Sequence, residues 1–309
     1  MAPTVSINLC CYNSEKFLDE TLRSIIAQTY KDWELVIVSD GSTDSTDSII
    51  KGYINQGYPI VYFWQKNHGL GYSRNEALKR SSGKYIAFID HDDIWLPHKL
   101  EKQLPLFDDP EVDMVYGNYY QINSDASKRR IGDRKKQPQG NVFRSFLKYY
   151  PVNLQTVMLR KSSLERLGPL FDPALHVSEE YDLLMRLLHN GKAAYLDIPV
   201  AEYRIHNAME SIRKMDHYPV ETTGILQRLS KLIPNFETDF RKELRYFRAK
   251  IAYWQACAEM QKGSPEKARE ALSPFKFVDI VFFGLFLLTF FSPSVWFLFI
   301  NNRRRLLWT

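Results

Sequence analysis

The chain has 309 residues, of which 45% are hydrophobic and 25% charged, and a formal net charge of +5. This composition argues against a disordered chain and a polytopic membrane protein, and the net charge is too small to indicate nucleic acid binding. Three cysteines, two of them adjacent, fit neither a disulfide framework nor a zinc site, and residues 1–4 leave no room for a signal peptide. We therefore expect a cytoplasmic protein with one large α/β domain and an appendage.

The first 90 residues alternate between strand and helix patterns. Strands are predicted over 5–9, 35–38, 60–64 and 85–89, and helices over 18–26, from a cap at Ser42 or Thr43 through Ile54, and over 70–80. The strands are apolar and partly β-branched, as expected for strands covered on both faces. This order predicts a mostly parallel, Rossmann-like sheet flanked by helices, in which ligands bind beyond the carboxyl ends of the strands.

Polar residues follow three of these strands. Tyr12 and Asn13 follow the first strand, Asp40-Gly41-Ser42 the second, and Asp90-His91-Asp92-Asp93 the fourth. Each group by itself is typical of a turn or a helix cap. Because three such groups come at successive strand ends, we expect them to line one rim of the sheet.

The acidic group after the fourth strand places Asp90, Asp92 and Asp93 within four residues. Carboxylates this close repel one another unless a cation joins them. Mg²⁺ or Mn²⁺ takes carboxylate oxygens and shares its remaining positions with phosphates, so the spacing suits a nucleoside diphosphate. The alternative interpretation is a surface turn that caps a helix beginning near Leu96-Pro97.

Three further segments carry candidate site residues. A glycine-containing stretch over 67–75 leads into the third helix and offers Arg74 to a phosphate. The acids at 179–182 open a predicted helix over 179–188, where they either interact with the helix dipole or supply a general base. His206 follows a predicted strand that ends in Tyr203-Arg204-Ile205, although a histidine by itself is more often structural than functional.

The second half of the chain changes pattern twice. Over 112–205 short strand patterns, at 114–116 and 156–159, predict antiparallel additions to the sheet. From 217 onward the pattern is helical and includes a helical hairpin of 244–260 and 265–272. We expect a first domain over 1–215, a C-terminal helical extension over 216–274, and an apolar segment with a basic tail over 275–309.

Two segments have an unusual charge distribution. Lys128-Arg129-Arg130 and Arg134-Lys135-Lys136 predict an irregular basic loop, which is either merely solvated or attracts an anionic acceptor. Residues 277–300 are almost uncharged, but Ser292-Pro293-Ser294 divides them, and a single span would violate the positive-inside tendency of the arginines that follow. We expect a monotopic or interfacial helix pair that contacts the membrane surface through 277–305, with a buried terminal helix as the alternative.

Taken together, these motifs resemble the family-2 glycosyltransferases, which have the A-type nucleotide-diphospho-sugar transferase fold. The resemblance covers about 5–211. It rests on an ordered series: 5–13, Asp40-Gly41-Ser42-Thr43-Asp44, 67–75, Ile89-Asp90-His91-Asp92-Asp93, Glu179-Glu180-Tyr181-Asp182-Leu183 and Tyr203-Arg204-Ile205-His206. No single motif is specific, but the complete ordered set is.

The resemblance implies a role for each candidate residue. Tyr12, Asn13, Asp40, Arg74 and Asp90 would bind the donor, with Tyr12 and Asp40 at the base and Asp90 at the ribose; Asp92 and His206 would hold Mn²⁺ or Mg²⁺; and Glu180 would be the catalytic base. Members of the family usually have Glu-Asp where this chain has Glu179-Glu180, so the base is one methylene longer.

The implied activity is inverting transfer of a sugar from a nucleotide-diphosphate sugar, a UDP-sugar by resemblance, to a saccharide or lipid-linked glycan at the cytoplasmic face of the membrane. It would serve cell-surface polysaccharide or glycan biosynthesis. Two alternatives stay open. One is metal-dependent phosphoester hydrolysis with His91 and His98 among its ligands. The other is a membrane-bound assembly partner that keeps the fold without turnover.

Overall fold

The computed structural model describes residues 2–133, 135–206, 209 and 213–303. The chain divides into two compact units, one formed by 1–143 and 151–207 and the other by 144–150 and 208–309. Among the described helices, none is long and apolar enough to cross a membrane. The domain boundaries expected near 215 and 274 stay a prediction.

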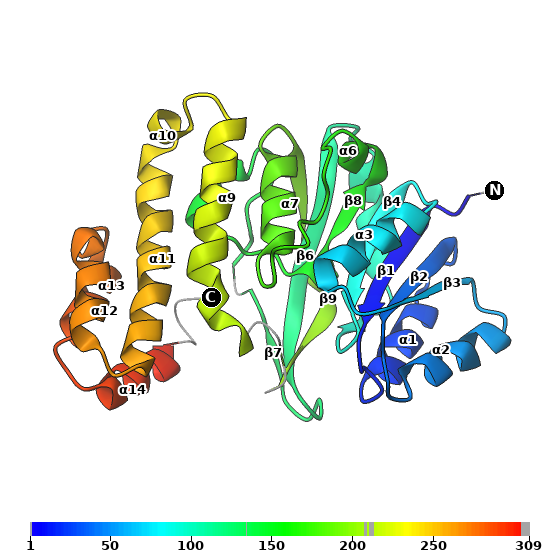
Figure 1. Cartoon of the computed structure of the whole chain (residues 1–309). Helices are drawn as coiled ribbons and strands as arrows, with labels where there is room; N and C mark the ends of the chain where they lie inside the picture. The colour runs from blue at the N-terminus through cyan, green and yellow to red at the C-terminus, as the bar shows by residue number, and fades with distance from the viewer. Residues whose placement is uncertain (1, 134, 207–208, 210–212, 304–309) are drawn as a thin grey trace. The chain divides into compact units, whose positions relative to one another are not determined.

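The first unit is built around one mixed sheet (Figure 1). In the described part of the chain its strands follow the order β3 (Ile60–Gln65), β2 (Trp33–Asp40), β1 (Val5–Cys11), β4 (Tyr85–Asp90), β8 (Met158–Arg160), β6 (Val112–Asn123), β9 (Lys192–Ile205) and β5 (Ile94–Trp95), with β7 (Arg129–Ile131) beside β6. The first four are parallel, β8 is antiparallel to both β4 and β6, and β9 is parallel to β6. The predicted parallel half with antiparallel additions is therefore confirmed.

The central strands are covered on both faces, which explains their continuous apolar sequence. Ile7 and Ile37 belong to a core cluster with Leu22 of α1 (Leu18–Ile26), whereas Val36 belongs to a second cluster with Ala77 of α3 (Leu70–Arg80). All five side chains are fully buried. Because the chain returns to the sheet through these helices, the carboxyl ends of β1, β2 and β4 meet at one edge.

The remaining helices of this unit are α2 (Thr46–Asn55), α4 (Lys99–Gln103), α6 (Lys161–Glu165) and α7 (Glu179–Leu188), with 3-10 turns η1 (Leu104–Phe107) and η2 (Leu154–Thr156). Several boundaries differ from the prediction, most of all that of β6, which runs from Val112 to Asn123 where 114–116 was predicted. Two of the differences have a clear local cause. α2 begins after Ser45, because Ser42 and Thr43 bond to Asn13 instead of capping a helix. The predicted strand over 156–159 begins two residues later, because Thr156 closes η2.

The second unit contains most of α5 (Phe143–Lys148) and the C-terminal helices. These are η3 (Met215–His217), α9 (Tyr218–Leu232), α10 (Phe236–Asp239), α11 (Arg241–Gln261), α12 (Pro265–Leu272), η4 (Ser273–Phe275), α13 (Ile280–Leu288) and α14 (Pro293–Arg303). Ala252 and Ala256 of α11 allow close approach of Ala268 on α12, which forms the expected helical hairpin. The predicted division of this segment is confirmed, although the break between α13 and α14 lies at 289–292, and Pro293 and Ser294 begin α14.

Candidate active site

The loops after β1 and β2 are joined by several hydrogen bonds, among them two that Asn13 makes and those between Glu15 and the segment Asp44-Ser45. The Asn13 amide donates to Ser42 Oγ at 3.1 Å, and the Asn13 carboxamide oxygen accepts from the Thr43 amide at 2.9 Å. Asn13 has a φ of 49°, a left-handed conformation that asparagine tolerates better than most residues. Asn13 thus shapes the rim, while its neighbour Tyr12 leaves 50% of its side chain exposed there.

Asp40 ends β2 and organises the loop that enters α3. Its Oδ1 accepts from Gln65 Nε2 at 2.7 Å and from the His68 amide at 2.9 Å, and its Oδ2 accepts from the Gly69 amide at 2.8 Å. Asp40 is 5% exposed. A carboxylate offers about four acceptor positions, so one remains for a ligand.

Arg74 connects the end of β4 to the start of α7. Its guanidinium lies 2.6 Å from Glu179 Oε1, 3.1 Å from Asp90 Oδ1 and 3.8 Å from Glu180 Oε2. Burial opposes the positive charge, but the three carboxylates outweigh it and raise the pKa of Arg74 above its ordinary value. We refer to these four residues as the Arg74 cluster, in which one cation faces three potential anions.

Glu180 is the most accessible acid of the α7 end of this cluster, with 30% of its side chain exposed against 3% for Glu179. Burial, followed by the negative charge of Glu179, raises the pKa of Glu180 to about 8, against the opposing influence of Arg74. A carboxylate with a raised pKa is a stronger base once it has lost its proton. Glu180 therefore has the environment of a proton acceptor.

The segment before α7 is fixed from two directions, which sets the position of Glu180. The side chain of Asn75 both donates to the Phe171 carbonyl at 2.7 Å and accepts from the Phe171 amide at 3.0 Å. Arg186 donates to the carbonyls of Pro169 and Leu170 and pairs with Asp182 at 2.9 Å. The helix carrying the candidate base is thereby attached to α3, which carries Arg74.

The candidate metal ligands Asp92 and His206 lie side by side. His206 Nε2 is 2.8 Å from Asp92 Oδ2, and their side chains are 13% and 16% exposed. Burial opposes ionisation of Asp92, but the His206 hydrogen bond and nearby His91 lower its pKa. A carboxylate and an imidazole suit Mn²⁺ or Mg²⁺. Within the described residues no group of three or more His, Cys, Asp or Glu side chains is arranged as a metal site, so diphosphate oxygens would have to complete the coordination.

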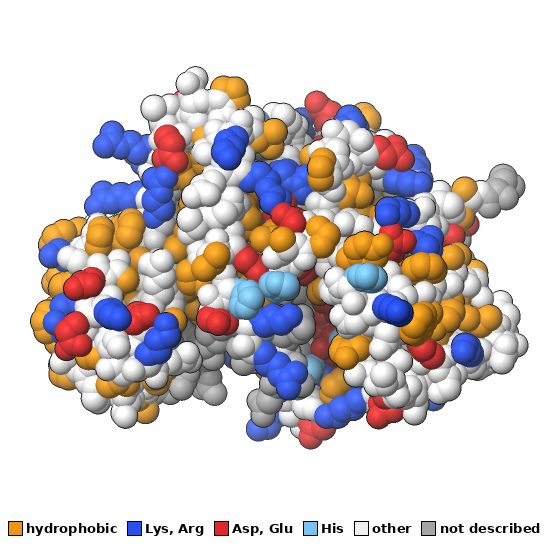
Figure 2. Space-filling view, viewed as in Figure 1, with side chains coloured by type: hydrophobic (Ala, Val, Ile, Leu, Met, Phe, Trp, Pro, Cys, Tyr) orange, Lys and Arg blue, Asp and Glu red, His pale blue; other side chains and the backbone are white. Residues whose placement is uncertain are grey.

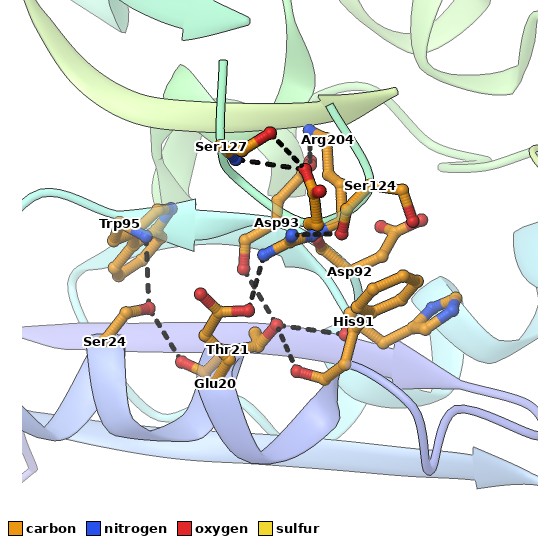
Figure 3. A network of polar contacts seen from close by, with 12 residues as sticks. Glu20, Thr21, Ser24, His91, Asp92, Asp93, Trp95, Ser124, Ser127 and Arg204 are labelled. Atoms are coloured by element: carbon orange, nitrogen blue, oxygen red, sulfur yellow. Dashed lines mark hydrogen bonds and ion pairs between the residues drawn. The ribbon is translucent and has the colours of Figure 1, made fainter. Parts of the chain in front are cut away.

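Arg204 holds the turn that carries Asp92, and sequence reasoning assigned it no role. It is 2% exposed and donates to the carbonyls of Asp92 and Ser124 and to Glu20 Oε2, the last at 2.6 Å. Figure 3 shows Arg204 beside these groups, with α1 below them. The only early signal was its place beside His206 in the 203–206 motif.

Asp93 is buried and does not act as a helix cap. Its Oδ1 accepts from the Arg204 amide at 2.8 Å, and its carbonyl accepts from Thr21 of α1. Burial, together with the charges of Asp92 and Asp90, raises the pKa of Asp93. The helix that follows begins only at Lys99, after His98. The surface-cap interpretation of the acidic turn is therefore wrong.

Neither His91 nor His98, the histidines of the hydrolase alternative, forms a side-chain hydrogen bond with Asp92 as His206 does, within the described residues. His98 is 62% exposed and bonds to Glu101 on its own helix. Thr21 binds the backbone carbonyl of His91, which fixes the turn without using its ring. A surface cavity of about 570 Å³ lies between α1 and α2, and its lining contains none of the predicted site residues.

Comparison with known proteins places the chain in a family. The model of the family described as glycosyl transferase family 2 matches residues 6–168, more than half of the chain. The chain belongs to glycosyl transferase family 2. It is 32% identical over 212 residues to the Escherichia coli UDP-Glc:alpha-D-GlcNAc-diphosphoundecaprenol beta-1,3-glucosyltransferase WfgD, covering 68% of this chain and 80% of that protein. It is 31% identical over 215 residues to the Bacillus subtilis putative teichuronic acid biosynthesis glycosyltransferase TuaG, covering 69% and 83%.

Solved structures share the fold of this family 2 glycosyltransferase. S. aureus TarS 1-349 in complex with UDP-GlcNAc superposes with a TM-score of 0.70 at 18% identity, covering 99% of this chain and 92% of that chain. The mannosyltransferase PcManGT from Pyrobaculum calidifontis, in complex with GDP-Man and Mn²⁺, gives a TM-score of 0.63 at 18% identity, covering 95% and 82%. The predicted fold is confirmed, while the roles of individual site residues stay predictions.

Proposed function

We propose that this glycosyltransferase moves a sugar from a UDP-sugar to a saccharide or lipid-linked glycan, with inversion and with a divalent metal, in cell-surface polysaccharide biosynthesis. The observation that carries the proposal is the Arg74 cluster. It brings the candidate donor residue Asp90 and the candidate base Glu180 to one guanidinium. Donor and acceptor chemistry can therefore meet at this point of the sheet edge.

The donor residues of the proposal are those at the three strand ends. Tyr12 and Asp40 would contact the base and Asp90 the ribose, with Asn13 shaping the rim. Asp40 keeps an acceptor position for an N–H donor. The choice of a uridine nucleotide is supported by two similar proteins, the UDP-Glc-dependent glucosyltransferase WfgD and TarS in complex with UDP-GlcNAc.

Asp92 and His206 are the residues that would hold Mn²⁺ or Mg²⁺. A bound divalent ion would neutralise charge on the diphosphate leaving group. The protein's own contribution is to fix the Asp92 turn through Arg204, so that the carboxylate does not have to be ordered when the donor binds.

Glu180 would take the proton of the acceptor hydroxyl. As that proton moves to the carboxylate, the acceptor oxygen forms a bond to the anomeric carbon and the bond between that carbon and the diphosphate oxygen breaks. A single displacement inverts the anomeric centre. The raised pKa of Glu180 favours proton uptake, and its partial exposure leaves the carboxylate open to an acceptor.

The decisive experiment measures acceptor-dependent release of UDP. A panel of UDP-sugars with Mn²⁺ is offered with and without saccharide acceptors linked to a lipid diphosphate, and the product's anomeric configuration is determined by NMR. We expect release that requires both metal and acceptor, and an inverted product. A retained configuration would refute the mechanism, whereas donor binding without any transfer would favour the assembly-partner alternative.

We further propose that the second unit attaches the enzyme to the cytoplasmic membrane surface through 277–305. Large apolar side chains on and beside α13 and α14 are exposed, namely Phe277, Ile280, Leu287, Phe290, Phe291, Leu298 and Phe299. Such helices lie in the interface rather than across it. Replacing Phe277, Ile280, Phe290 and Phe291 by serine should release the protein from sedimenting vesicles. Unchanged sedimentation would contradict this attachment. Arg304 and Arg305, also part of the expected contact, lie outside the described residues.

A further inference from the structure

The basic segment over 124–133 and 135–136, which we call the basic hairpin, contains a strand that its sequence does not predict, and Arg134 lies outside the described residues. The expected irregular loop contains β7, which pairs antiparallel to the end of β6 through Tyr120, Gln121 and Ile122. The prediction of an irregular loop is therefore wrong for 129–131, whose backbone pairs with β6, whereas 132–133 and 135–139 contain neither helix nor strand. Pairing with β6 thus holds the backbone that carries Arg129 and Arg130 in place.

The basic hairpin carries an excess of positive charge over its two carboxylates, Asp125 and Asp133. Arg129 pairs with Glu202 at 2.9 Å and stacks on Tyr120, whereas Arg130 donates to the neutral Gln121. Lys128, Arg130, Lys135 and Lys136 are exposed or partly exposed and form no ion pair within the described residues. Figure 2 shows Lys and Arg side chains gathered around β7 on this face.

Strand register places the basic hairpin beside the candidate metal ligands. Ile122 pairs with Arg129 on one side and with Arg204 on the other, so the three residues form one row across the sheet. The Ser124 carbonyl at the base of the hairpin accepts from Arg204, which also binds the Asp92 carbonyl (Figure 3). The base of the hairpin is thus attached to the turn that would hold the donor diphosphate.

The donor alone does not account for these cations. Its diphosphate would be neutralised by the metal that Asp92 and His206 would hold, and Arg204, which binds the Asp92 and Ser124 carbonyls, joins that turn to the base of the hairpin. Exposed lysines and arginines next to a reaction site attract anions over a distance, and arginine binds phosphate oxygens in a bidentate manner. The second substrate is the partner left to supply such groups.

We propose that the basic hairpin binds the phosphate groups of the acceptor, and that the acceptor is a saccharide joined to a lipid through a diphosphate. This inference rests on the proposed function and assigns a binding site to its acceptor. The binding site consists of Lys128, Arg130, Lys135 and Lys136. Arg129 shapes the hairpin through Glu202. The similar protein WfgD is a glucosyltransferase named for such a diphosphate-linked acceptor.

The test uses the full chain in detergent micelles, where no anionic headgroup is present. The hairpin variant replaces Lys128, Arg130, Lys135 and Lys136 by glutamine. A matched control variant replaces four exposed lysines elsewhere in the first unit, Lys31, Lys51, Lys84 and Lys102. Each protein is assayed with one saccharide carried either on a lipid diphosphate or on an uncharged alkyl linker of equal length.

We expect the hairpin variant to lose about 30-fold in kcat/KM for the diphosphate acceptor, through KM. Transfer to the uncharged acceptor should stay within about twofold, as should UDP-sugar binding and the control variant. A charge-preserving variant with K128R, R130K, K135R and K136R should retain most of the affinity. Raising the salt concentration should weaken the wild type and leave the hairpin variant nearly unchanged.

Equal loss with both acceptors, or no loss with either, would overturn the inference. So would a hairpin variant whose only defect is weaker binding to vesicles of anionic lipid, because the hairpin would then bind headgroups. A separate arm measures binding of the diphosphate acceptor in the presence of UDP and Mn²⁺. That arm decides the inference even if the wild type transfers no sugar, a result that would refute the proposed function alone.

Discussion

Two polar regions at the same sheet edge are built in opposite ways. Around the Asp92 turn, Arg204 is shared among carbonyls and the single carboxylate of Glu20, and Thr21 fixes the backbone from α1. In the Arg74 cluster one guanidinium faces three carboxylates. The first region also holds several carboxylates, since Asp92 and Asp90 raise the pKa of Asp93, but it is hydrogen-bonded into one geometry, whereas the second gathers its three carboxylates on one guanidinium. Fixed geometry suits a leaving-group site, and a charge imbalance suits a base.

The sharpest test of this contrast is Glu180→Gln, which removes the proposed base from the Arg74 cluster. Transfer should fall about a thousandfold, because the acceptor proton loses its destination, while UDP-sugar binding stays unchanged. Initial rates and calorimetric donor binding measure the two effects. Glu180→Asp, which introduces the residue usual in the family, should keep measurable transfer. Full activity of Glu180→Gln would remove Glu180 from the mechanism.

The matching change in the fixed region is Asp92→Asn. It removes one of the two proposed metal ligands and should lower transfer about 100-fold and abolish the dependence of donor binding on Mn²⁺. Binding titrations with and without Mn²⁺ provide the measurement. Asp108→Asn, at an exposed position, is the control. Wild-type metal dependence in Asp92→Asn would assign the cation to other residues.

Arg204→Met tests whether the hydrogen bonds of Arg204 to the Asp92 turn stabilise the folded protein. Loss of the guanidinium leaves the buried carbonyls of Asp92 and Ser124 without a donor, so the free energy of unfolding should fall by about 2 kcal/mol. Denaturant titration followed by circular dichroism reports this change. Arg23→Met, at a side chain that is 75% exposed, should be nearly neutral. A neutral Arg204→Met would mean that the turn is held by Thr21 and Asp93 alone.

The smallest expected effect concerns the Arg74 cluster and is the pH dependence of transfer. A base with a pKa of about 8 is protonated below that pH, so kcat should rise as pH increases and level off above 8. Below the midpoint the slope should approach tenfold per pH unit. Because the charge of Glu179 raises the pKa of Glu180, Glu179→Gln should move the midpoint to lower pH. An unmoved midpoint would contradict the coupling between the two acids.

Local patterns predicted the fold better than the contacts of the site. Helices α3 and α7 were predicted with their observed bounds, because periodicity and flanking residues define them within the sequence. The Arg74–Glu179 pair joins residues 105 positions apart, and the Arg204 amide binds an Asp93 carboxylate 111 positions away. A motif can identify such residues, but only the folded chain decides which of them face each other.

The contact between Asn75 and Phe171 also limits how this enzyme can be recombined. Gly71, one turn earlier on α3, has the carbonyl of Asp172 3.0 Å from where a Cβ would lie, so the same helix and loop touch twice. A chimera that joins the first part of this chain, through α3, to the later part of a relative crosses this contact. Such an exchange is expected to succeed only where 71, 75 and 171–173 are inherited together, which makes this small interface a boundary for modular redesign.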